Sequence, residues 1–259
     1  MLTPEGLYYE EDGCGPPLIL SAGLGGAGSY WMPNVPALAE HRRVILYDHL
    51  GTGKSAPGLQ DRLTIDDMAS DVLALMDSAG IERAEFMGHA LGGIIGLALA
   101  RRAPERLSKL IIVNGWAKAD PATLRCFNAR LHILNSGGPR AYLEAQPMFL
   151  FPAMWISAHD EQIARDTEVH LAHFQGEETL RKRIAALAAF DATEWLHTLK
   201  MPILALAARD DVLVPYTATV RLAGLLDETW REMDWGGHAC NVTEPDIFNE
   251  LILEFLGSN

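Results

Sequence analysis

The chain has 259 residues, of which 49% are hydrophobic, and its formal net charge is -13, from Lys+Arg 21 against Asp+Glu 34. This apolar content excludes intrinsic disorder, because it suffices for a large core. The acidic balance argues against nucleic acid or an anionic membrane surface as a partner, since no basic stripe is present to neutralise phosphates. Single α/β domains reach about this length, so one domain with an insertion is expected.

The cysteines are odd in number and widely spaced, at Cys14, Cys126 and Cys240. This usage predicts neither a disulfide framework nor a zinc cluster, and it suits a reducing compartment. No stretch approaches the roughly 18 apolar residues of a membrane span, and residues 1–11 lack the apolar core of a signal peptide. We therefore expect a cytoplasmic protein without a membrane segment.

Short apolar runs alternate with helical patterns through the first 116 residues. Strands are expected at 17–22, 43–48, 84–87 and 109–114, and helices at 65–78 and 94–102. The strands are apolar along their whole length rather than at every second residue, which indicates a parallel sheet covered on both faces. The pattern therefore predicts a doubly wound α/β sheet.

The alternation stops between residues 117 and 195, where the sequence is helical or irregular and rich in aromatic residues. It resumes with a strand at 202–207, a helix at 216–226, a strand at 231–235 and a helix at 245–256. The interrupting segment is apolar enough to pack on something. We therefore expect a core of residues 1–116 and 196–259 with a helical lid at 117–195. The apolar lid also suggests a mating surface for a homodimer.

The loops after the strands should carry the chemistry, because ligands of open parallel sheets bind beyond the carboxyl ends of the strands. Residues 88–92 read Gly-His-Ala-Leu-Gly between a strand and a helix. This is the layout of the nucleophile elbow G-x-S-x-G, in which small residues allow a sharp turn that lifts the middle side chain above the sheet. The middle residue here is Ala90, which carries no nucleophile.

Asp211 follows a later strand, and His238 comes after the strand beyond it. Elbow first, acid second and histidine last is the chain order of the α/β-hydrolase triad. Asp210 is the alternative acid, and both residues could instead be structural. Their joint placement after successive strands favours a catalytic dyad. His89 is expected to pack beside the elbow. His170 and His173 have a spacing that can hold metal, but without a third ligand a role on the lid or helix face is expected.

The sequence resembles the α/β-hydrolase fold over the core, and over the whole chain it resembles the RutD family of aminoacrylate or carbamate hydrolases in bacterial uracil degradation. The resemblance rests on five strings, at 113–116 (VNGW), 144–147 (EAQP), 151–155 (FPAMW), 171–176 (LAHFQG) and 237–243 (GHACNVT). RutD-like elbows also carry alanine, which implies that Ala90 is native. Two positions depart from general hydrolase patterns, Ala22 before Gly23 and Leu50 before Gly51, and both are largely scaffold.

Ala90 restricts the possible chemistry, because no acyl-enzyme can form there. An oxyanion hole and binding alone are worth roughly 10³–10⁴ over water in proteases, so the substrate must already be close to hydrolysing. Carbamate and the imine tautomer of aminoacrylate meet this condition. The sequence thus predicts a cofactor-free hydrolase in which Asp211 orients His238, which activates a water above Ala90. The N–H groups of Leu24 and Leu91 would form the oxyanion hole.

The substrate pocket is expected to involve a few polar and aromatic side chains, namely Asn114, Trp116, Gln146, Phe149 and Trp155. At a net charge of -13 the overall field would not attract small anions, so a carboxylate must be held by local groups such as the oxyanion amides or a lid arginine. Two other functions stay open. One is a cofactor-independent oxygenase or lyase, in which the dyad abstracts a substrate proton. The other is a non-catalytic binder of small molecules.

Overall fold

The computed structural model describes residues 1–227 and 230–257. These residues contain a seven-stranded sheet in the order β1-β3-β2-β4-β5-β6-β7, with β1 antiparallel to β3 and every other neighbouring pair parallel. The strands are β1 Tyr9–Asp12, β2 Pro17–Ser21, β3 Arg43–Tyr47, β4 Ala84–His89, β5 Leu107–Val113, β6 Ile203–Ala208 and β7 Trp230–Met233. The predicted α/β-hydrolase architecture is confirmed.

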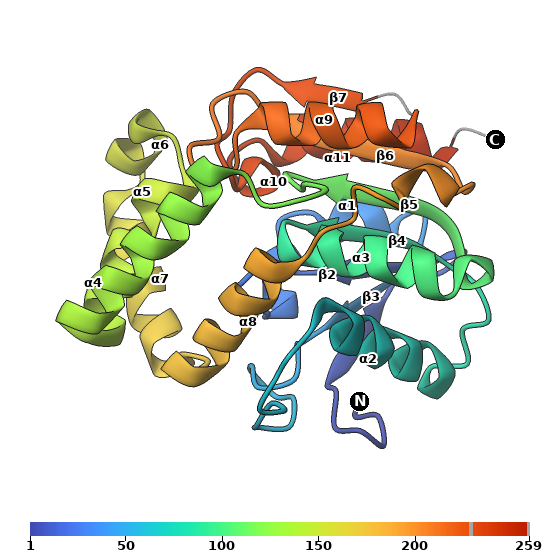
Figure 1. The fold of residues 1–259 in the computed structure, drawn as a ribbon, viewed down its shortest axis with the longest axis horizontal. Helices are drawn as coiled ribbons and strands as arrows, with labels where there is room; N and C mark the ends of the chain where they lie inside the picture. Colours follow the sequence, from blue (N-terminus) through green and yellow to red (C-terminus); the bar gives the residue numbers. More distant parts are fainter. Residues whose placement is uncertain (228–229, 258–259) are drawn as a thin grey trace.

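Consecutive strand residues face opposite layers, which explains why the strands are apolar throughout. Ile19 joins the hydrophobic cluster on one face of the sheet, and its neighbour Leu20 joins the cluster on the other face. The helices of the first face are α2 Ile65–Ser78, α3 Leu91–Arg102 and α9 Tyr216–Leu226, and those of the second are α1 Val35–Ala39 and α11 Pro245–Gly257 (Figure 1). The helix α2 begins where Thr64 and Asp67 form a capping box.

Five helices follow β5 and precede β6 in the chain: α4 Pro121–Ala145, α5 Pro147–Leu150, α6 Ala153–Ala158, α7 Asp160–Ala172 and α8 Glu177–Ala189. They form the left-hand body in Figure 1 and make up the lid. Its two ends meet at a neck, where Lys118 bridges to Asp191 and the N–H of Ala192 donates to the carbonyl of Ala117 at 2.9 Å. The helix α4 is kinked at Gly138, whose φ is 72°.

Some elements differ from the sequence expectation. The edge strand β1 was not expected because its sequence, Tyr-Glu-Glu-Asp, is polar and only Tyr9 is buried. The short helix α10, Cys240–Thr243, was also not expected, since it lies between the histidine loop and α11. The described residues also contain three short 3-10 helices: η1 Gly28–Trp31, η2 Pro104–Arg106 and η3 Leu196–Thr198.

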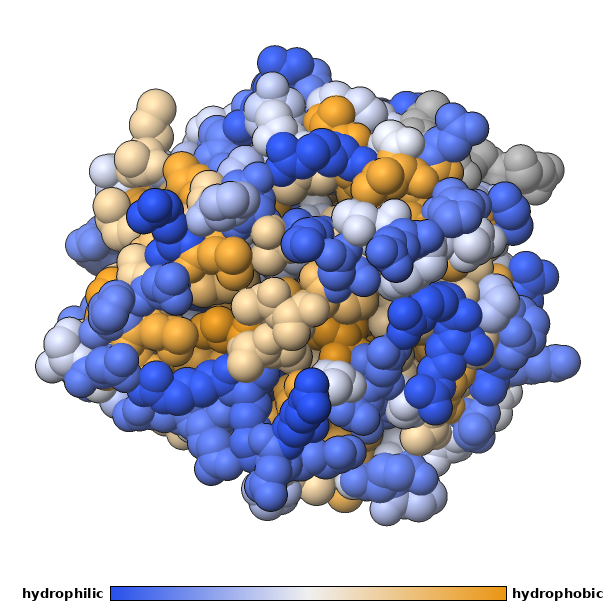
Figure 2. Space-filling model, viewed as in Figure 1, coloured by the Kyte–Doolittle hydropathy of each residue, from blue (hydrophilic) through white to orange (hydrophobic). Residues whose placement is uncertain are grey.

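No helix among residues 1–227 and 230–257 is both long and apolar enough to cross a bilayer. Hydrophobic surface is visible over the lid side of the molecule among polar side chains (Figure 2). Large exposed apolar side chains of the lid include Met148 on α5 and Met154 on α6.

Candidate active site

The turn between β4 and α3 has the strained backbone of a nucleophile elbow. Ala90 stands at its apex with φ 47° and ψ -107°, a conformation that non-glycine residues rarely adopt. A Cβ on Gly88 would lie 2.1 Å from the backbone carbon of Gly92, and a Cβ on Gly92 would lie 2.2 Å from the carbonyl oxygen of Ser21. Both flanking positions therefore require glycine, and the turn places Ala90 at the carboxyl edge of the sheet.

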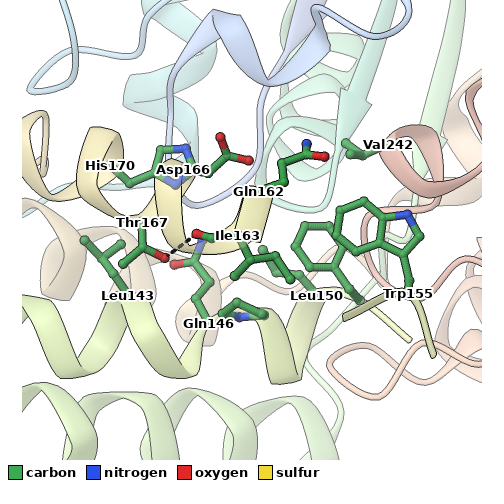
Figure 3. A pocket seen from close by; sticks show the side chains of 12 residues that line it. Leu143, Gln146, Leu150, Trp155, Gln162, Ile163, Asp166, Thr167, His170 and Val242 are labelled. Atoms are coloured by element: carbon green, nitrogen blue, oxygen red, sulfur yellow. Dashed lines mark hydrogen bonds between the residues drawn. The ribbon is translucent and has the colours of Figure 1, made fainter. Parts of the chain in front are cut away.

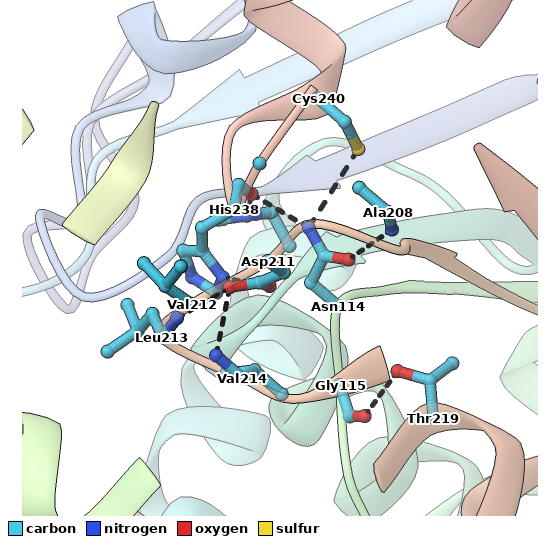
Figure 4. Close-up of polar contacts among 12 residues, drawn as sticks. Asn114, Gly115, Ala208, Asp211, Val212, Leu213, Val214, Thr219, His238 and Cys240 are labelled. Atoms are coloured by element: carbon cyan, nitrogen blue, oxygen red, sulfur yellow. Dashed lines mark hydrogen bonds and ion pairs between the residues drawn. The ribbon is translucent and has the colours of Figure 1, made fainter. Parts of the chain in front are cut away.

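The histidine and aspartate predicted from the sequence form a buried pair. His238 Nδ1 lies 2.7 Å from Asp211 Oδ2 (Figure 4), and both side chains are almost fully buried. The other carboxylate oxygen of Asp211 accepts the N–H groups of Leu213 at 2.8 Å and Val214 at 2.9 Å. A carboxylate so placed accepts the Nδ1–H of His238 and thereby holds the proton on Nδ1. Nε2 of His238 has no hydrogen-bond partner within residues 1–227 and 230–257, which leaves it available as a base.

Asp210, the alternative acid, has a different task. Its carboxylate accepts the N–H of Gly237 at 2.8 Å and, more weakly, that of Gly236 at 3.4 Å. It thereby holds the start of the loop that carries His238.

Asn114 holds the loop that carries His238 through side-chain hydrogen bonds. Its side-chain amide donates to the carbonyl of His238 at 2.8 Å, and its side-chain oxygen accepts the N–H of Ala208 at 3.1 Å (Figure 4). Asn114 is 1% exposed and has φ 50°. The sequence assigned it to the substrate pocket, but its polar atoms are occupied in joining β5, β6 and the histidine loop.

A second histidine supports the first. His89 Nε2 lies 2.7 Å from the carbonyl of His238, so this nitrogen carries the proton. Burial lowers the pKa of His89 well below its usual value, and the neighbouring His238 lowers it further, so the ring stays neutral. Its Nδ1 is buried without a partner in the described structure, and a Cβ on Gly23 would come within 2.8 Å of it. His89 therefore packs beside the elbow, as expected.

The oxyanion hole was predicted from the backbone N–H groups of Leu91 and Leu24, which lie in two different segments. Leu91 is the first residue of α3, where N–H groups point out of the helix and the dipole favours negative charge. The loop at Leu24 is held from the lid, because its carbonyl accepts Gln175 Nε2 at 3.1 Å and Arg183 Nη1 at 3.3 Å. Arg183 is fully buried and also donates to the carbonyl of Leu50 at 2.9 Å. Sequence reasoning did not single out this arginine, because a buried arginine has no local signature.

Cys240 lies two residues after His238, yet it is not a replacement nucleophile. Its thiol is buried, and burial together with the charge of Asp211 raises its pKa to about 12. A thiol that stays protonated is a poor nucleophile.

The other predicted pocket residues divide into two groups. Trp116 is buried against Phe127 of the lid, with ring centroids 6.4 Å apart, and Phe149 packs against the same hydrophobic cluster that contains Ala90. Gln146 and Trp155 instead line a groove of about 80 Å³ between lid helices and α10 (Figure 3). Ala90, Asp211 and His238 do not line that groove. Leu150 also lines the groove, and its carbonyl accepts the N–H of Ala239 at 3.0 Å, so the groove borders the histidine loop.

His170 of α7 faces the same groove (Figure 3), and His173 bonds to the carbonyl of Val169 at the end of that helix. Among the described residues, no group of three histidine, cysteine or acidic side chains is placed to hold a metal ion.

A family model of the alpha/beta hydrolase fold matches residues 16–245. Proteins named carbamate hydrolase RutD from Agrobacterium fabrum and Azorhizobium caulinodans are 46% and 47% identical to this chain. The first match covers 96% of both chains, and the second covers 97% of this chain and 95% of the relative. The chain belongs to the RutD family. It is thus a RutD-family hydrolase, and the matches extend over the lid as well as the core.

Solved structures agree with the fold of this RutD-family chain. An enol-lactonase from Burkholderia xenovorans LB400 superposes with a TM-score of 0.87 at 28% identity, covering 99% of this chain and 98% of that one. A hydrolase from Pseudomonas aeruginosa PA01 superposes with a TM-score of 0.87 at 27% identity, covering 97% of this chain and 94% of that one.

Proposed function

We propose that this RutD-family hydrolase accelerates hydrolysis of the carbon–nitrogen bond of carbamate or aminoacrylate and releases ammonia, in the breakdown of pyrimidines such as uracil. The observation that carries the proposal is that the site has an oriented base but no nucleophilic side chain at the elbow. His238 is held by Asp211 with Nε2 unpartnered, while Ala90 occupies the elbow. The names of the full-length relatives support the substrate class.

The reaction needs one water and one proton shuttle. His238 Nε2 takes a proton from a water above Ala90, and the water oxygen bonds to the substrate carbon. For the imine tautomer of aminoacrylate, this addition gives a carbinolamine; for carbamate, it gives a tetrahedral carbon bearing the amino group. For carbamate, the protonated His238 returns its proton to the amino group, and the carbon–nitrogen bond breaks as ammonia leaves. For the imine, this first return completes the carbinolamine, and His238 Nε2 then carries the hydroxyl proton of the carbinolamine to the nitrogen, so that the carbonyl forms as the carbon–nitrogen bond breaks. The products are ammonia with pyruvate from aminoacrylate, or ammonia with bicarbonate from carbamate.

The N–H groups of Leu24 and Leu91 would stabilise negative charge on oxygen, which develops during water addition to carbamate and during loss of the hydroxyl proton from the carbinolamine. Arg183 and Gln175 support this arrangement by fixing the carbonyl of Leu24 from the lid. A site without a covalent nucleophile supplies roughly 10³–10⁴ in rate over water in proteases, which suits a substrate that is already unstable.

The decisive experiment is a time-resolved measurement of ammonia release from freshly generated aminoacrylate or carbamate, because the uncatalysed background is fast. We expect His238→Ala to lose about 10²–10⁴ of the catalysed rate, as removal of a general base does. His197→Ala is the matched control, since His197 is exposed and far from β4 in sequence. An unchanged rate in His238→Ala would contradict the mechanism.

Two other functions would give different results in the same assay. A non-catalytic binder would retain substrate analogues while showing no protein-dependent ammonia release. A cofactor-independent oxygenase or lyase would consume a larger substrate in a His238-dependent manner without releasing ammonia. Either result would replace the hydrolase proposal.

A further inference from the structure

Arg130 is a buried cation without a counter-ion in the protein. It lies on α4 of the lid and is 4% exposed. Its one hydrogen bond within the described residues runs from Nη2 to the hydroxyl of Tyr142 at 2.5 Å, and its Nε is buried without a partner. No described carboxylate lies within 4.0 Å of it. Tyr142 does not supply the missing charge, because burial raises the pKa of its phenol.

An unpaired buried charge is costly, and proteins normally pair it with an anion. The guanidinium of Arg130 instead lies near two aromatic rings, 5.1 Å from the centroid of Tyr142 and 5.7 Å from that of Phe149. Aromatic faces stabilise a cation only partly, and they leave the planar donors of the guanidinium without acceptors. The guanidinium of Arg130 therefore keeps donor capacity that none of the described residues uses.

The surroundings of Arg130 connect it to both catalytic loops. One turn earlier on α4, Cys126 Sγ donates to the carbonyl of Val212, the residue after Asp211, at 3.5 Å. On the other side, Phe149 is followed by Leu150, whose carbonyl accepts the N–H of Ala239, the residue after His238, at 3.0 Å. The segments on either side of Arg130 thus touch the loops that carry the dyad.

A second orphaned donor lies in the same region. The indole Nε1 of Trp116 is buried without a partner in the described part of the chain. Trp116 packs on Phe127, three residues before Arg130 on the same helix, and the hydrophobic cluster that holds both rings also holds Ala90. Two buried donors without acceptors, one on α4 and the other packed against α4, favour a ligand that brings oxygen lone pairs.

We propose that Arg130 is the carboxylate-binding residue of the substrate site and selects a small monocarboxylate anion. This inference rests on the proposed function, because aminoacrylate and carbamate both carry such a group. A guanidinium binds a carboxylate with two parallel hydrogen bonds, which orients as well as attracts the anion. It also supplies the local positive charge that a protein at -13 lacks in its overall field.

The test uses unreactive analogues, so that binding is measured without turnover. Methacrylate has the shape of aminoacrylate, acetate has the shape of carbamate, and methacrylamide is the neutral counterpart of methacrylate. Isothermal titration of the wild type should show methacrylate binding about tenfold or more tightly than methacrylamide, since a hydrogen bond to a charged group is worth that much. Comparison with acetate then shows which of the two carboxylates fits the site.

Arg130→Met should lose about tenfold or more in methacrylate affinity and show a raised KM for the natural substrate. Arg125→Gln is the matched control, because Arg125 is an exposed arginine on the same helix. If Arg130→Met does not fold, the double variant Arg130→Met/Tyr142→Phe removes both hydrogen-bonding partners together and tests the same point. Equal binding of methacrylate and methacrylamide to the wild type would overturn the proposal. Full methacrylate affinity in Arg130→Met, or in Arg130→Met/Tyr142→Phe, would overturn it too.

The two proposals can fail separately. His238→Ala should still bind methacrylate, since it keeps Arg130. Arg130-dependent binding with a reaction rate that is independent of His238 would reject the water mechanism and leave the carboxylate site standing. A His238-dependent rate without Arg130-dependent binding would do the reverse.

Discussion

Asp210 and Asp211 are neighbours in the chain, and their carboxylates hold two different parts of one loop. Asp211 accepts from the ring of His238, whereas Asp210 accepts from the backbone of Gly237. We expect Asp211→Asn to lower the rate of ammonia release by about 10² or more, because an amide does not fix the Nδ1–H tautomer. Asp210→Asn should cost less, since an amide oxygen still accepts from an N–H. Equal losses in the two variants would show that the carboxylates act only on the loop.

Ala90→Ser restores an oxygen at the elbow. If His238 Nε2 faces this position, the serine should be activated and attack p-nitrophenyl acetate, giving a burst of about one equivalent of p-nitrophenol and an acetylated protein by mass spectrometry. The double variant Ala90→Ser/His238→Ala should lose the burst. Absence of any burst or adduct in the single variant would mean that the dyad does not serve residue 90.

Gly92→Ala should destabilise the fold, because the added methyl group would lie 2.2 Å from the carbonyl oxygen of Ser21. We expect a loss of about 1–3 kcal/mol or more in the free energy of unfolding, measured by urea denaturation. Gly224→Ala provides the contrast, since nothing lies within 4 Å of its Cβ position and it stands inside α9. That variant should gain about 0.5–1 kcal/mol. Similar effects at both glycines would contradict the elbow geometry.

His89 should make stability depend on pH. Burial, with the nearby His238, lowers its pKa well below 6.5 in the folded protein, so only the unfolded chain takes up a proton as the pH falls. Its stabilising contribution is therefore complete above about pH 6.5 and is lost below it. Between about pH 7.5 and about pH 5.5, the wild type should lose more free energy of unfolding than His89→Gln does.

Two other groups also titrate in this range, and the comparison of the two proteins removes them. The pKa of His49 is likewise lowered by burial, and burial raises that of Asp71 to about 7, which gives the opposite slope. Both residues are present in the wild type and in His89→Gln. Parallel pH profiles for the two proteins would show that His89 is accessible to protons in the fold.

A homodimer through the lid stays a proposal. Met148 and Met154 are 65% and 80% exposed on adjacent lid helices, which is unusual for such apolar side chains. Analytical ultracentrifugation should then detect a concentration-dependent dimer, and Met154→Glu should weaken it by placing a charge in the interface. A wild type that sediments as a monomer at all concentrations would reject this expectation.

Periodicity predicted the regular elements well. The helices at 65–78 and 216–226 have the expected bounds, because both carry clear apolar spacing and, for the first, an N-terminal cap. The edge strand β1 was not predicted, because its sequence is polar and one of its edges is open. Pairing of Asp211 with His238 followed from chain order, since the order of strands in this fold brings those loops together.

Side-chain direction inside the lid could not be predicted. Gln146 and Trp155 line a groove that Ala90, Asp211 and His238 do not line, while Arg130 and Arg183, which the sequence did not single out, are buried. Their placement depends on how five helices pack on one another and on the kink at Gly138, and such contacts leave no pattern in the local sequence. Asn114 shows the same limit, because its bonds to Ala208 and His238 join segments about 100 residues apart.

The neck of the lid allows the lid sequence to vary independently of the sheet. The lid leaves the sheet at Ala117 and returns at Ala192, and a backbone hydrogen bond joins these two residues. An inserted body whose ends already touch can be replaced by another, of different length or composition, without moving the strands on either side. The strands and the elbow would keep their positions, while the lid contacts to the Leu24 loop and to the loops of Asp211 and His238 would be exchanged together with the substrate-binding side chains.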